Sequence, residues 1–399
     1  MRILLLVQYY LPFRKSCAQL FHDLALEFRA RGHQIMIISA DDSVAAKGEV
    51  KGDGNWLEIR VNCGSMDASS RVGRALNEWR MSSRIYRYGL KEFEKYPCDL
   101  IVYYSPTVFF GSLVHKLKSL WRAKSYLILR DIFPQWAVDA GILRENGLPH
   151  RYFRRKEIEH HRAATVIGVQ SPANLEYFRQ QGWGNSYRLE VLYNWKTVSD
   201  PAVGGHRFRR EMGLAGKVVF FYGGNIGVAQ DMDNIVKLAE GVRDIPQACF
   251  LLVGEGSEVP RLKTAIQEKG LGNFFILPSV GQDEYLAMVG EADVGLISLD
   301  KNLRNHNFPG KLLDYMFFSK PILASINPGN DLKQALEGAR CGFVSINGEA
   351  ETLRRDAVKL MENAETRSEM GRNARSLLLK QFSTAGAAGR ILEAIGSAA

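Results

Sequence analysis

The sequence is poor in features that mark secreted, zinc-binding or membrane-spanning proteins. Its 399 residues include only five cysteines, at positions 17, 63, 98, 249 and 341, without the close spacing of zinc ligands. We therefore expect reduced thiols in a cytoplasmic protein. No run of 18 uncharged apolar residues occurs, which argues against a spanning helix. The apolar start at residues 1–7 lacks a signal-peptide cleavage site and predicts a first buried strand.

Motifs for nucleic-acid or metal binding are also missing. The formal net charge of +9 suggests an acidic partner, either a nucleotide, a nucleic acid or an anionic membrane. Nucleic acid ranks last, because no RNA- or DNA-binding motif accompanies the charge. Glu157, Glu159, His160 and His161 invite a metal interpretation, but their spacing does not repeat on one helix face. A solvated helix face is the commoner explanation, so no metal site is predicted.

The length of the chain and the order of its elements predict two α/β domains. Short apolar runs, typical of buried parallel strands, alternate with segments of helical periodicity in both halves. Residues 196–216 have no apolar period and include Pro201, Gly204 and Gly205, which is typical of a linker. We expect a first domain over residues 1–197, with a closing helix at 385–399 packed back on it, and a second over 198–384.

Residues 305–315 form the most informative stretch. They lie between an apolar run at 292–298 and another at 322–325, so they predict a strand–loop–helix–strand unit. Pro309 suits a first helical position because it lacks an N–H group. Gly310 and Lys311 then place free backbone N–H groups and one cation at a helix start, the form of an anion site. With Asp314 one turn later, a phosphate joined to a hydroxyl-rich sugar is the ligand that fits best.

Three other segments are candidate ligand loops. The glycines of 223–227 follow an apolar strand and let backbone approach a ligand, although a glycine loop alone is a weak signal. Asp131 follows the strand at 124–130, where it is either a functional carboxylate or a helix cap. The loop at 9–16 after the first strand either binds a ligand or merely connects. Spacing alone does not decide between these alternatives.

A long helix predicted from about residue 70 to 96 carries a basic face. Arg80, Arg84, Arg87 and Lys91 recur on it at helical spacing, interleaved with aromatic residues. A solvated face above a packed one is the commoner arrangement. The alternative is a face that lies on anionic lipid, which a second basic cluster at 151–156 favours.

Taken together, these segments resemble the retaining glycosyltransferases of family 4. The resemblance covers nearly the whole chain and is closest to the bacterial branch typified by the O-antigen fucosaminyltransferase WbuB. It implies the GT-B fold, two doubly wound Rossmann-like domains facing across a cleft. The matching pieces are Tyr9-Tyr10-Leu11-Pro12, Arg29-Ala30-Arg31-Gly32-His33, Leu129-Arg130-Asp131-Ile132-Phe133-Pro134, Tyr222-Gly223-Gly224-Asn225-Ile226-Gly227, Val253-Gly254-Glu255-Gly256 and Pro309-Gly310-Lys311-Leu312-Leu313-Asp314-Tyr315.

The resemblance implies transfer of an N-acetylated or deoxy hexose from a UDP-sugar, with retention at the anomeric carbon. The acceptor would be a lipid-linked glycan or polysaccharide of O-antigen or capsule synthesis, made at the inner face of the plasma membrane. No metal or cofactor is expected. The implied catalytic residues are Asp131 and Lys311; the implied substrate-binding residues are Gly223, Gly224, Asn225, Pro309 and Gly310 for the diphosphate, Glu258, Pro278 and Val280 for the base, Asp314 for ribose, His306 for the sugar, and Tyr10 and Ser16 for the acceptor.

The sequence departs from the family pattern in two respects. The family often has a pair of glutamates, and here His306 stands at the first position and Asp314 at the second. Many members also have a pair of basic residues where this chain has Asn225 and Gln230. Neutralising the phosphates is therefore left to Lys311 or Arg304. The alternatives are a nucleotide-sugar 2-epimerase of the same fold, which needs carboxylates in the cleft, and a sugar-binding protein with a decayed site.

Overall fold

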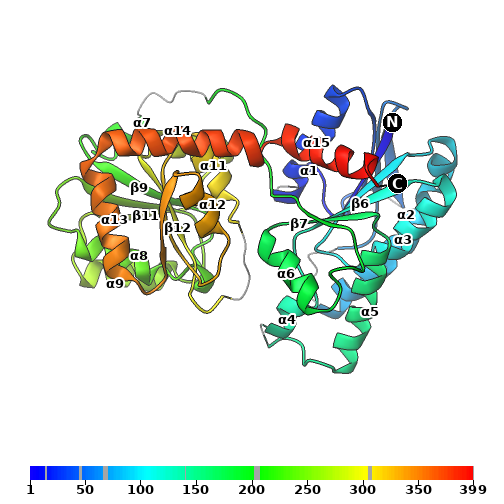
Figure 1. Ribbon diagram of the computed structural model, residues 1–399, viewed down its shortest axis with the longest axis horizontal. Helices are drawn as coiled ribbons and strands as arrows, with labels where there is room; N and C mark the ends of the chain where they lie inside the picture. The colour runs from blue at the N-terminus through cyan, green and yellow to red at the C-terminus, as the bar shows by residue number, and fades with distance from the viewer. Residues whose placement is uncertain are drawn as a thin grey trace. The chain divides into compact units, whose positions relative to one another are not determined.

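The computed structural model describes residues 1–13, 16–44, 47–65, 71–139, 141–201, 207–303 and 308–398. It consists of two compact units, described separately below. Unit 1 comprises Met1–Thr197 and Thr384–Ala399, and unit 2 comprises Val198–Ser383 (Figure 1). Each unit is a twisted sheet covered by helices on both faces, so the predicted α/β class with two doubly wound Rossmann-like domains is confirmed.

Unit 1 is built on a sheet in the order β3-β4-β2-β1-β5-β6-β7-β8. All neighbours pair in parallel except β3 and β4, which form an antiparallel hairpin at one edge. The strands are β1 (Arg2–Val7), β2 (Gln34–Ala40), β3 (Gly48–Gly52), β4 (Trp56–Val61), β5 (Leu100–Tyr104), β6 (Lys124–Leu129), β7 (Val166–Val169) and β8 (Leu189–Val191). The helices are α1 (Ser16–Ala30), α2 (Arg71–Lys95), α3 (Gly111–Trp121), α4 (Gln135–Asp139), α5 (Leu148–Arg162), α6 (Pro172–Gln180) and α15 (Thr384–Gly396).

The two faces of this sheet carry separate apolar cores. One core joins the sheet to α2, α3 and α6. The other joins it to α1 and α15, so the closing helix packs on the first unit, as Figure 1 shows. Because both faces are covered, the central strands are apolar along almost their whole length rather than alternating.

Unit 2 has a wholly parallel sheet in the order β11-β10-β9-β12-β13-β14. The strands are β9 (Val218–Gly223), β10 (Ala248–Val253), β11 (Phe274–Leu277), β12 (Val294–Ser298), β13 (Ile322–Ile326) and β14 (Gly342–Ile346). The helices are α7 (Arg207–Glu211), the short 3-10 helix η1 (Val228–Gln230), α8 (Asp233–Gly241), α9 (Val259–Glu268), α10 (Gln282–Glu291), α11 (Lys311–Phe317), α12 (Leu332–Gly338), α13 (Ala350–Glu362) and α14 (Ala364–Gln381).

Each sheet reverses its strand order once, and this reversal locates the expected ligand site. In unit 2 the chain winds outward from β9 to β11 and then resumes on the other side of β9 with β12. In unit 1 the same reversal separates β1 from β5. Helices on opposite faces diverge at such a point, and ligands of open α/β sheets bind there, outside the carboxyl ends of the strands.

One sequence-based interpretation of α5 is wrong. Glu157, His160 and His161 were expected on a solvated face, but all three side chains are buried. Gly111 allows this packing, because a Cβ at that position would lie 2.9 Å from the backbone of His160. Burial raises the pKa of Glu157 to about 7, although the Arg154 guanidinium, 2.7 Å from the carboxylate, acts to lower it. Within the described ranges, no three His, Cys, Asp or Glu side chains form a metal-binding group.

The structure also bears on the membrane and on the cysteines. Among the described residues, no helix combines the length and apolar character needed to cross a bilayer. All five cysteines are free thiols, and four of them are buried.

Candidate functional site

The carboxyl end of β9 continues into a glycine loop, residues 223–227, that interlocks with the loop after β10. The Gly224 amide donates to the Val253 carbonyl at 2.9 Å, and the Ile226 amide donates to the Glu255 carbonyl at 2.7 Å. A Cβ at Gly254 would lie 1.9 Å from the Gly224 oxygen. Only glycine allows this approach, so the two loops form one continuous backbone surface at the strand reversal.

Substituting Gly256 by Ala tests this interlock. The new methyl group would lie 2.0 Å from the Ile226 carbonyl oxygen, so the two loops must separate. We expect the unfolding free energy of unit 2 to fall by about 1–3 kcal/mol, the usual cost of overpacking. Thermal denaturation measures the loss, and Gly272→Ala is the control because nothing lies within 4 Å of its Cβ position. Equal stability of the two variants would contradict the interlock.

Lys311, the first residue of α11, reaches over the glycine loop. Its ammonium lies 3.6 Å from the ring centroid of Tyr222, whose hydroxyl donates to the Asn225 carbonyl at 2.6 Å. The Lys311 Nζ is also 3.8 Å from the Cβ position of Gly224. Of the carboxylates in the described parts of the chain, none forms a salt bridge with Lys311. The ammonium therefore stands over the loop with an aromatic face beneath it and no anion opposite.

The position of α11 is fixed by contacts on its buried side. The Tyr315 hydroxyl lies 3.1 Å from the Phe221 carbonyl and 3.2 Å from the Leu296 carbonyl. The ring fits because Gly295 faces it, where a Cβ would lie 2.3 Å away. At the other end, Arg375 donates to the Phe317 carbonyl at 2.9 Å. The helix has seven residues, so few peptide dipoles add up, and Lys311 itself supplies most of the positive charge.

The predicted contact of Lys311 with a diphosphate would make nucleotide binding depend on pH. Burial lowers the pKa of its ammonium to about 7, so the amine is mostly neutral at higher pH. A bound diphosphate favours the charged form and raises that pKa, so binding above pH 7 takes up a proton. We expect UDP affinity to fall as pH rises through roughly 7 to 9, above the phosphate ionisation near pH 6. In this range the affinity should fall by up to about tenfold per pH unit.

Titration calorimetry tests this dependence directly. Near pH 8, the heat of UDP binding should differ between buffers of different ionisation enthalpy by an amount that corresponds to proton uptake. The Lys311→Met variant should bind UDP weakly and show no such difference. An affinity that stays constant between pH 7 and 9 would mean that Lys311 does not contact the phosphates.

Asp314 lies one turn after Lys311 and already has a protein partner. Tyr285 forms a side-chain hydrogen bond with Asp314. The pKa of the Tyr285 hydroxyl is raised mainly by burial and, to a smaller extent, by the negative charge of Asp314. The Tyr285 ring also packs against Gly223, where a Cβ would lie 2.2 Å from the ring. The contact of Asp314 with ribose stays a prediction, made from a carboxylate whose orientation Tyr285 helps to set.

The residues predicted around the base lie on neighbouring loops. Glu258 accepts a hydrogen bond from Arg261 at 2.8 Å, next to the start of α9. Pro278 is exposed and Val280 partly exposed, just after β11. Ser279 between them donates to Glu255, which links the loops after β10 and β11. The structure thus gathers these residues on one edge of unit 2, and their contact with a base stays a prediction.

Two of the remaining predicted donor residues, Pro309 and Gly310, directly precede α11, and Asn225 belongs to the glycine loop. Gly310 is exposed, with nothing within 4 Å of its Cβ position, and Pro309 precedes it as a partly buried residue. Asn225 donates through its side chain to Gln230 at 2.9 Å, which braces the glycine loop. His306 and Arg304 lie outside the described residues.

In unit 1, Asp131 follows β6 at the carboxyl edge of the sheet. Asp131 is exposed, and its backbone carbonyl accepts a hydrogen bond from the Ser105 hydroxyl at 3.1 Å. Desolvation raises the pKa of its carboxyl group, and the positive charge of Arg130 lowers it by less. Arg130 itself is buried and donates to the Asn194 side chain at 2.6 Å. Asp131 is thus accessible on an anchored loop.

The structure assigns a different role to Tyr10, which was predicted to contact the acceptor. Its side chain is only 2% exposed, and its hydroxyl lies 2.7 Å from His22 Nδ1. The ring therefore supports the loop after β1 from within the core and presents no surface to an acceptor. Ser16 begins α1, and its side chain lies outside the described residues.

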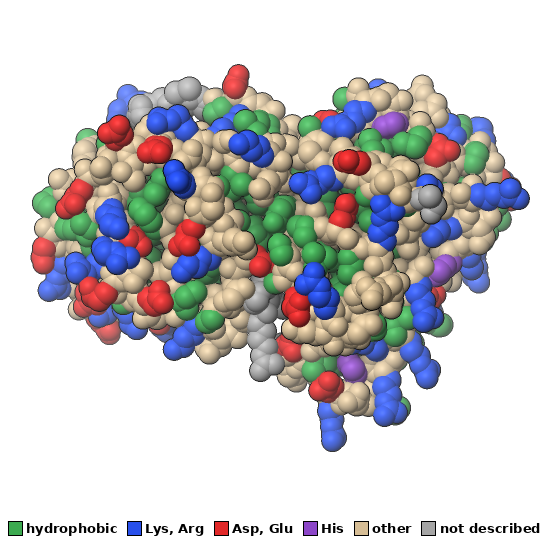
Figure 2. Space-filling view, viewed as in Figure 1, with side chains coloured by type: hydrophobic (Ala, Val, Ile, Leu, Met, Phe, Trp, Pro, Cys, Tyr) green, Lys and Arg blue, Asp and Glu red, His purple; other side chains and the backbone are tan. Residues whose placement is uncertain are grey.

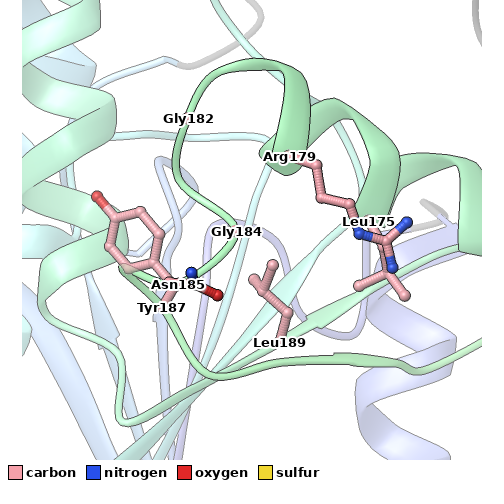
Figure 3. A pocket seen from close by; sticks show the side chains of 7 residues that line it. All are labelled: Leu175, Arg179, Gly182, Gly184, Asn185, Tyr187 and Leu189. Atoms are coloured by element: carbon pink, nitrogen blue, oxygen red, sulfur yellow. The ribbon is translucent and has the colours of Figure 1, made fainter.

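A hollow of about 600 Å³ opens in unit 1 between α6 and β8 (Figure 3). The loop that lines it precedes a parallel strand, so it lies at the amino edge of the sheet, opposite Asp131. Its one charged side chain, Arg179, pairs with Glu176 at 3.0 Å. The hollow therefore lacks both the location and the free charge of the predicted site. Its lining is Leu175, Arg179, Gly182, Gly184, Asn185, Tyr187 and Leu189.

Comparison with known sequences finds similarity to glycosyltransferases over part of the chain. Residues 207–377 match the family model described as "Glycosyl transferases group 1". "Probable glycosyltransferase WbjE" of Pseudomonas aeruginosa is 26% identical over 226 residues, which cover 55% of each chain. "Putative colanic acid biosynthesis glycosyl transferase WcaI" of Escherichia coli K12 is 30% identical over 121 residues, 30% of each chain. The chain thus spans about half the length of the first relative and less of the second.

Comparison with solved structures concerns the fold. The Anabaena protein HepE, solved in complex with UDP, superposes with a TM-score of 0.72 at 16% identity and with full coverage of both chains. The fold of the chain is therefore the two-domain GT-B fold of such glycosyltransferases.

Proposed function

We propose that the chain is a retaining glycosyltransferase of family 4 that transfers a sugar from a UDP-sugar to a lipid-linked or polysaccharide acceptor. The observation that carries the proposal is the Lys311 ammonium, held over the glycine loop at the strand reversal of unit 2, where no carboxylate of the described residues pairs with it. The family model covers this region, and the relatives that match are named as glycosyltransferases. UDP as the nucleotide is supported by the HepE complex.

In this proposal unit 2 holds the donor. Lys311 neutralises the diphosphate as it leaves the anomeric carbon, and such stabilisation of a departing charge is usually the largest catalytic contribution. The Gly224 amide already donates to the last residue of β10 and the Ile226 amide to the loop after it, so the glycine loop allows close approach while Lys311 supplies the charge. Asp314 holds the ribose hydroxyls, and the edge formed by Glu258, Pro278 and Val280 holds the base. The chemistry uses no metal.

Unit 1 presents the acceptor in this proposal, with Asp131 next to the reacting hydroxyl. The donor sugar is an N-acetylated or deoxy hexose, as in the WbuB-type O-antigen branch. The product enters O-antigen or capsule synthesis at the inner face of the plasma membrane. The name of WcaI, which refers to colanic acid biosynthesis, supports a surface polysaccharide as the destination.

An assay with separated donor and acceptor tests the function. The protein is incubated with a panel of UDP-N-acetylhexosamines and UDP-deoxyhexoses, with and without isoprenyl-diphosphate-linked sugars, and the products are analysed by mass and anomeric NMR. We expect a glycolipid heavier by one sugar, with the donor's anomeric configuration. An epimerised donor formed without acceptor would indicate an epimerase instead. Tight UDP binding without turnover on any acceptor would indicate a binding protein.

A further inference from the structure

We propose that a small pocket enclosed by α2, α3 and α5 of unit 1 binds the phosphate of the acceptor lipid. This inference rests on the proposed function and specifies how unit 1 recognises its acceptor. The ligand is a phosphate ester of a long apolar chain, whose chain lies along α2. The pocket has a volume of about 180 Å³ and is lined by Trp79, Arg80, Ser83, Phe109, Ser112 and Lys156.

The size and charge of the pocket suit an anionic headgroup. Pockets for drug-sized ligands occupy roughly 300–1,000 Å³, so this one is too small for a nucleotide sugar. Arg80 is exposed, and no carboxylate in the described ranges pairs with it. Lys156 donates to Glu159 at 2.7 Å and so brings a partly neutralised charge. The Ser83 and Ser112 hydroxyls add neutral donors, and phosphate is the group that takes such a mixed set.

The rim of the pocket suits an apolar chain. Trp79 is 53% exposed, and Leu76, three residues earlier on α2, is 46% exposed. Residues three apart on a helix are neighbours, so they form one apolar track that leads to the pocket. Phe109 forms an inner wall, fixed by a hydrogen bond from the Ser82 hydroxyl to its carbonyl at 2.5 Å. An exposed indole beside a basic pocket favours an amphiphile over free phosphate.

The pocket lies on the side of unit 1 where lysines and arginines gather. Figure 2 shows these side chains along the surface formed by α2, α3 and α5. The pocket is also close to the acceptor edge, because Phe109 belongs to the loop between β5 and α3. Four residues of backbone, at most about 14 Å, separate it from Ser105, whose hydroxyl bonds the Asp131 carbonyl. A lipid phosphate held here would place its sugar on the side of Asp131.

Binding of farnesyl phosphate to the full chain tests the inference. We expect it to bind at least tenfold more tightly than farnesol or inorganic phosphate, because only farnesyl phosphate fills both the pocket and the track. The double variant Arg80→Gln/Lys156→Gln should lose about tenfold in affinity for farnesyl phosphate and little for farnesol. Trp79→Ala should weaken both. The matched control is Arg87→Gln/Lys91→Gln, which removes two exposed charges from α2 outside the pocket and should change nothing.

Two further measurements separate the possible outcomes. If the pocket and control variants lose affinity equally, the inference is overturned in favour of general adsorption to anionic lipid. If binding to phosphatidylglycerol vesicles depends on the pocket residues while binding of farnesyl phosphate does not, it is overturned in favour of a site for membrane lipid. UDP binding is measured on the same samples. Normal UDP binding and transfer without pocket-dependent farnesyl phosphate binding refutes the pocket alone. Pocket-dependent lipid binding without UDP binding refutes the proposed function and leaves the pocket standing.

Discussion

Replacing Lys311 by Met is expected to lower the rate of sugar transfer about 10²–10³-fold, the usual effect of removing one preorganised charge from a leaving group. The methionine keeps the contact with the Tyr222 ring but brings no charge to the diphosphate. UDP affinity should fall as well, because Lys311 is the cation that stands over the glycine loop.

The same substitution should not destabilise the fold. Burial lowers the pKa of Lys311 from 10.5 to about 7 in the folded protein, so between these values the unfolded chain binds more protons. The contribution of this group to stability therefore rises with pH across that window and is least favourable below pH 7. At pH 6–7 the Met variant should melt at the same temperature as the parent or higher. Lower activity with retained stability is the signature of a residue kept for function.

The control for Lys311 is Lys237→Met, which removes an exposed lysine from α8. It should leave transfer and UDP binding unchanged. Rates are measured under saturating donor and at low donor, so that loss of binding and loss of catalysis separate. Equal rates for the Lys311 and Lys237 variants would refute the proposed diphosphate site.

Replacing Asp131 by Asn is expected to lower transfer by about 10²-fold or more, in the range of a positioned acid–base group, without changing UDP affinity. UDP affinity should not change because Asp131 lies in unit 1, whereas the predicted donor-binding residues lie in unit 2. Desolvation raises the pKa of the carboxyl. As pH falls, transfer should therefore decline at a higher pH than an ordinary aspartate would give.

The Asn substitution keeps the shape of the side chain and leaves the backbone bond from Ser105 in place. Glu94→Gln, an exposed carboxylate on α2, serves as the charge-matched control. Loss of UDP binding in the Asp131 variant, or full transfer activity, would contradict the assignment of this residue to the acceptor.

The linear pattern located the loops of the site but not their mutual contacts. Apolar strands followed by polar or glycine-bearing loops predicted which segments end at the ligand edge, and Lys311 was found because it follows such a strand and loop. The interlock of Gly254 with Gly224 was not predictable, because it depends on two strands pairing side by side. Nor did periodicity reveal that Tyr315 anchors α11, since its hydroxyl partners are carbonyls of β9 and β12.

The errors arose where tertiary packing overrides a local pattern. Tyr10 sits in a loop that resembles an acceptor loop, yet its ring turns into the core and pairs with His22. Glu157 and its neighbouring histidines are polar residues on a helix, where exposure is the commoner outcome. Burial there depends on a distant glycine, Gly111, and on aromatic rings from α6 and the loop after it.

The placement of α15 has a consequence for how the chain is made. Unit 2 is a continuous segment, Val198–Ser383, whereas unit 1 needs residues from both sides of it. Ala388 and Ile391 of α15 fill the core that covers one face of the first sheet. During synthesis from the N-terminus, the later-made unit therefore has its full complement of residues before the earlier one does. Until α15 is made, the apolar core that α1 covers in part stays incomplete.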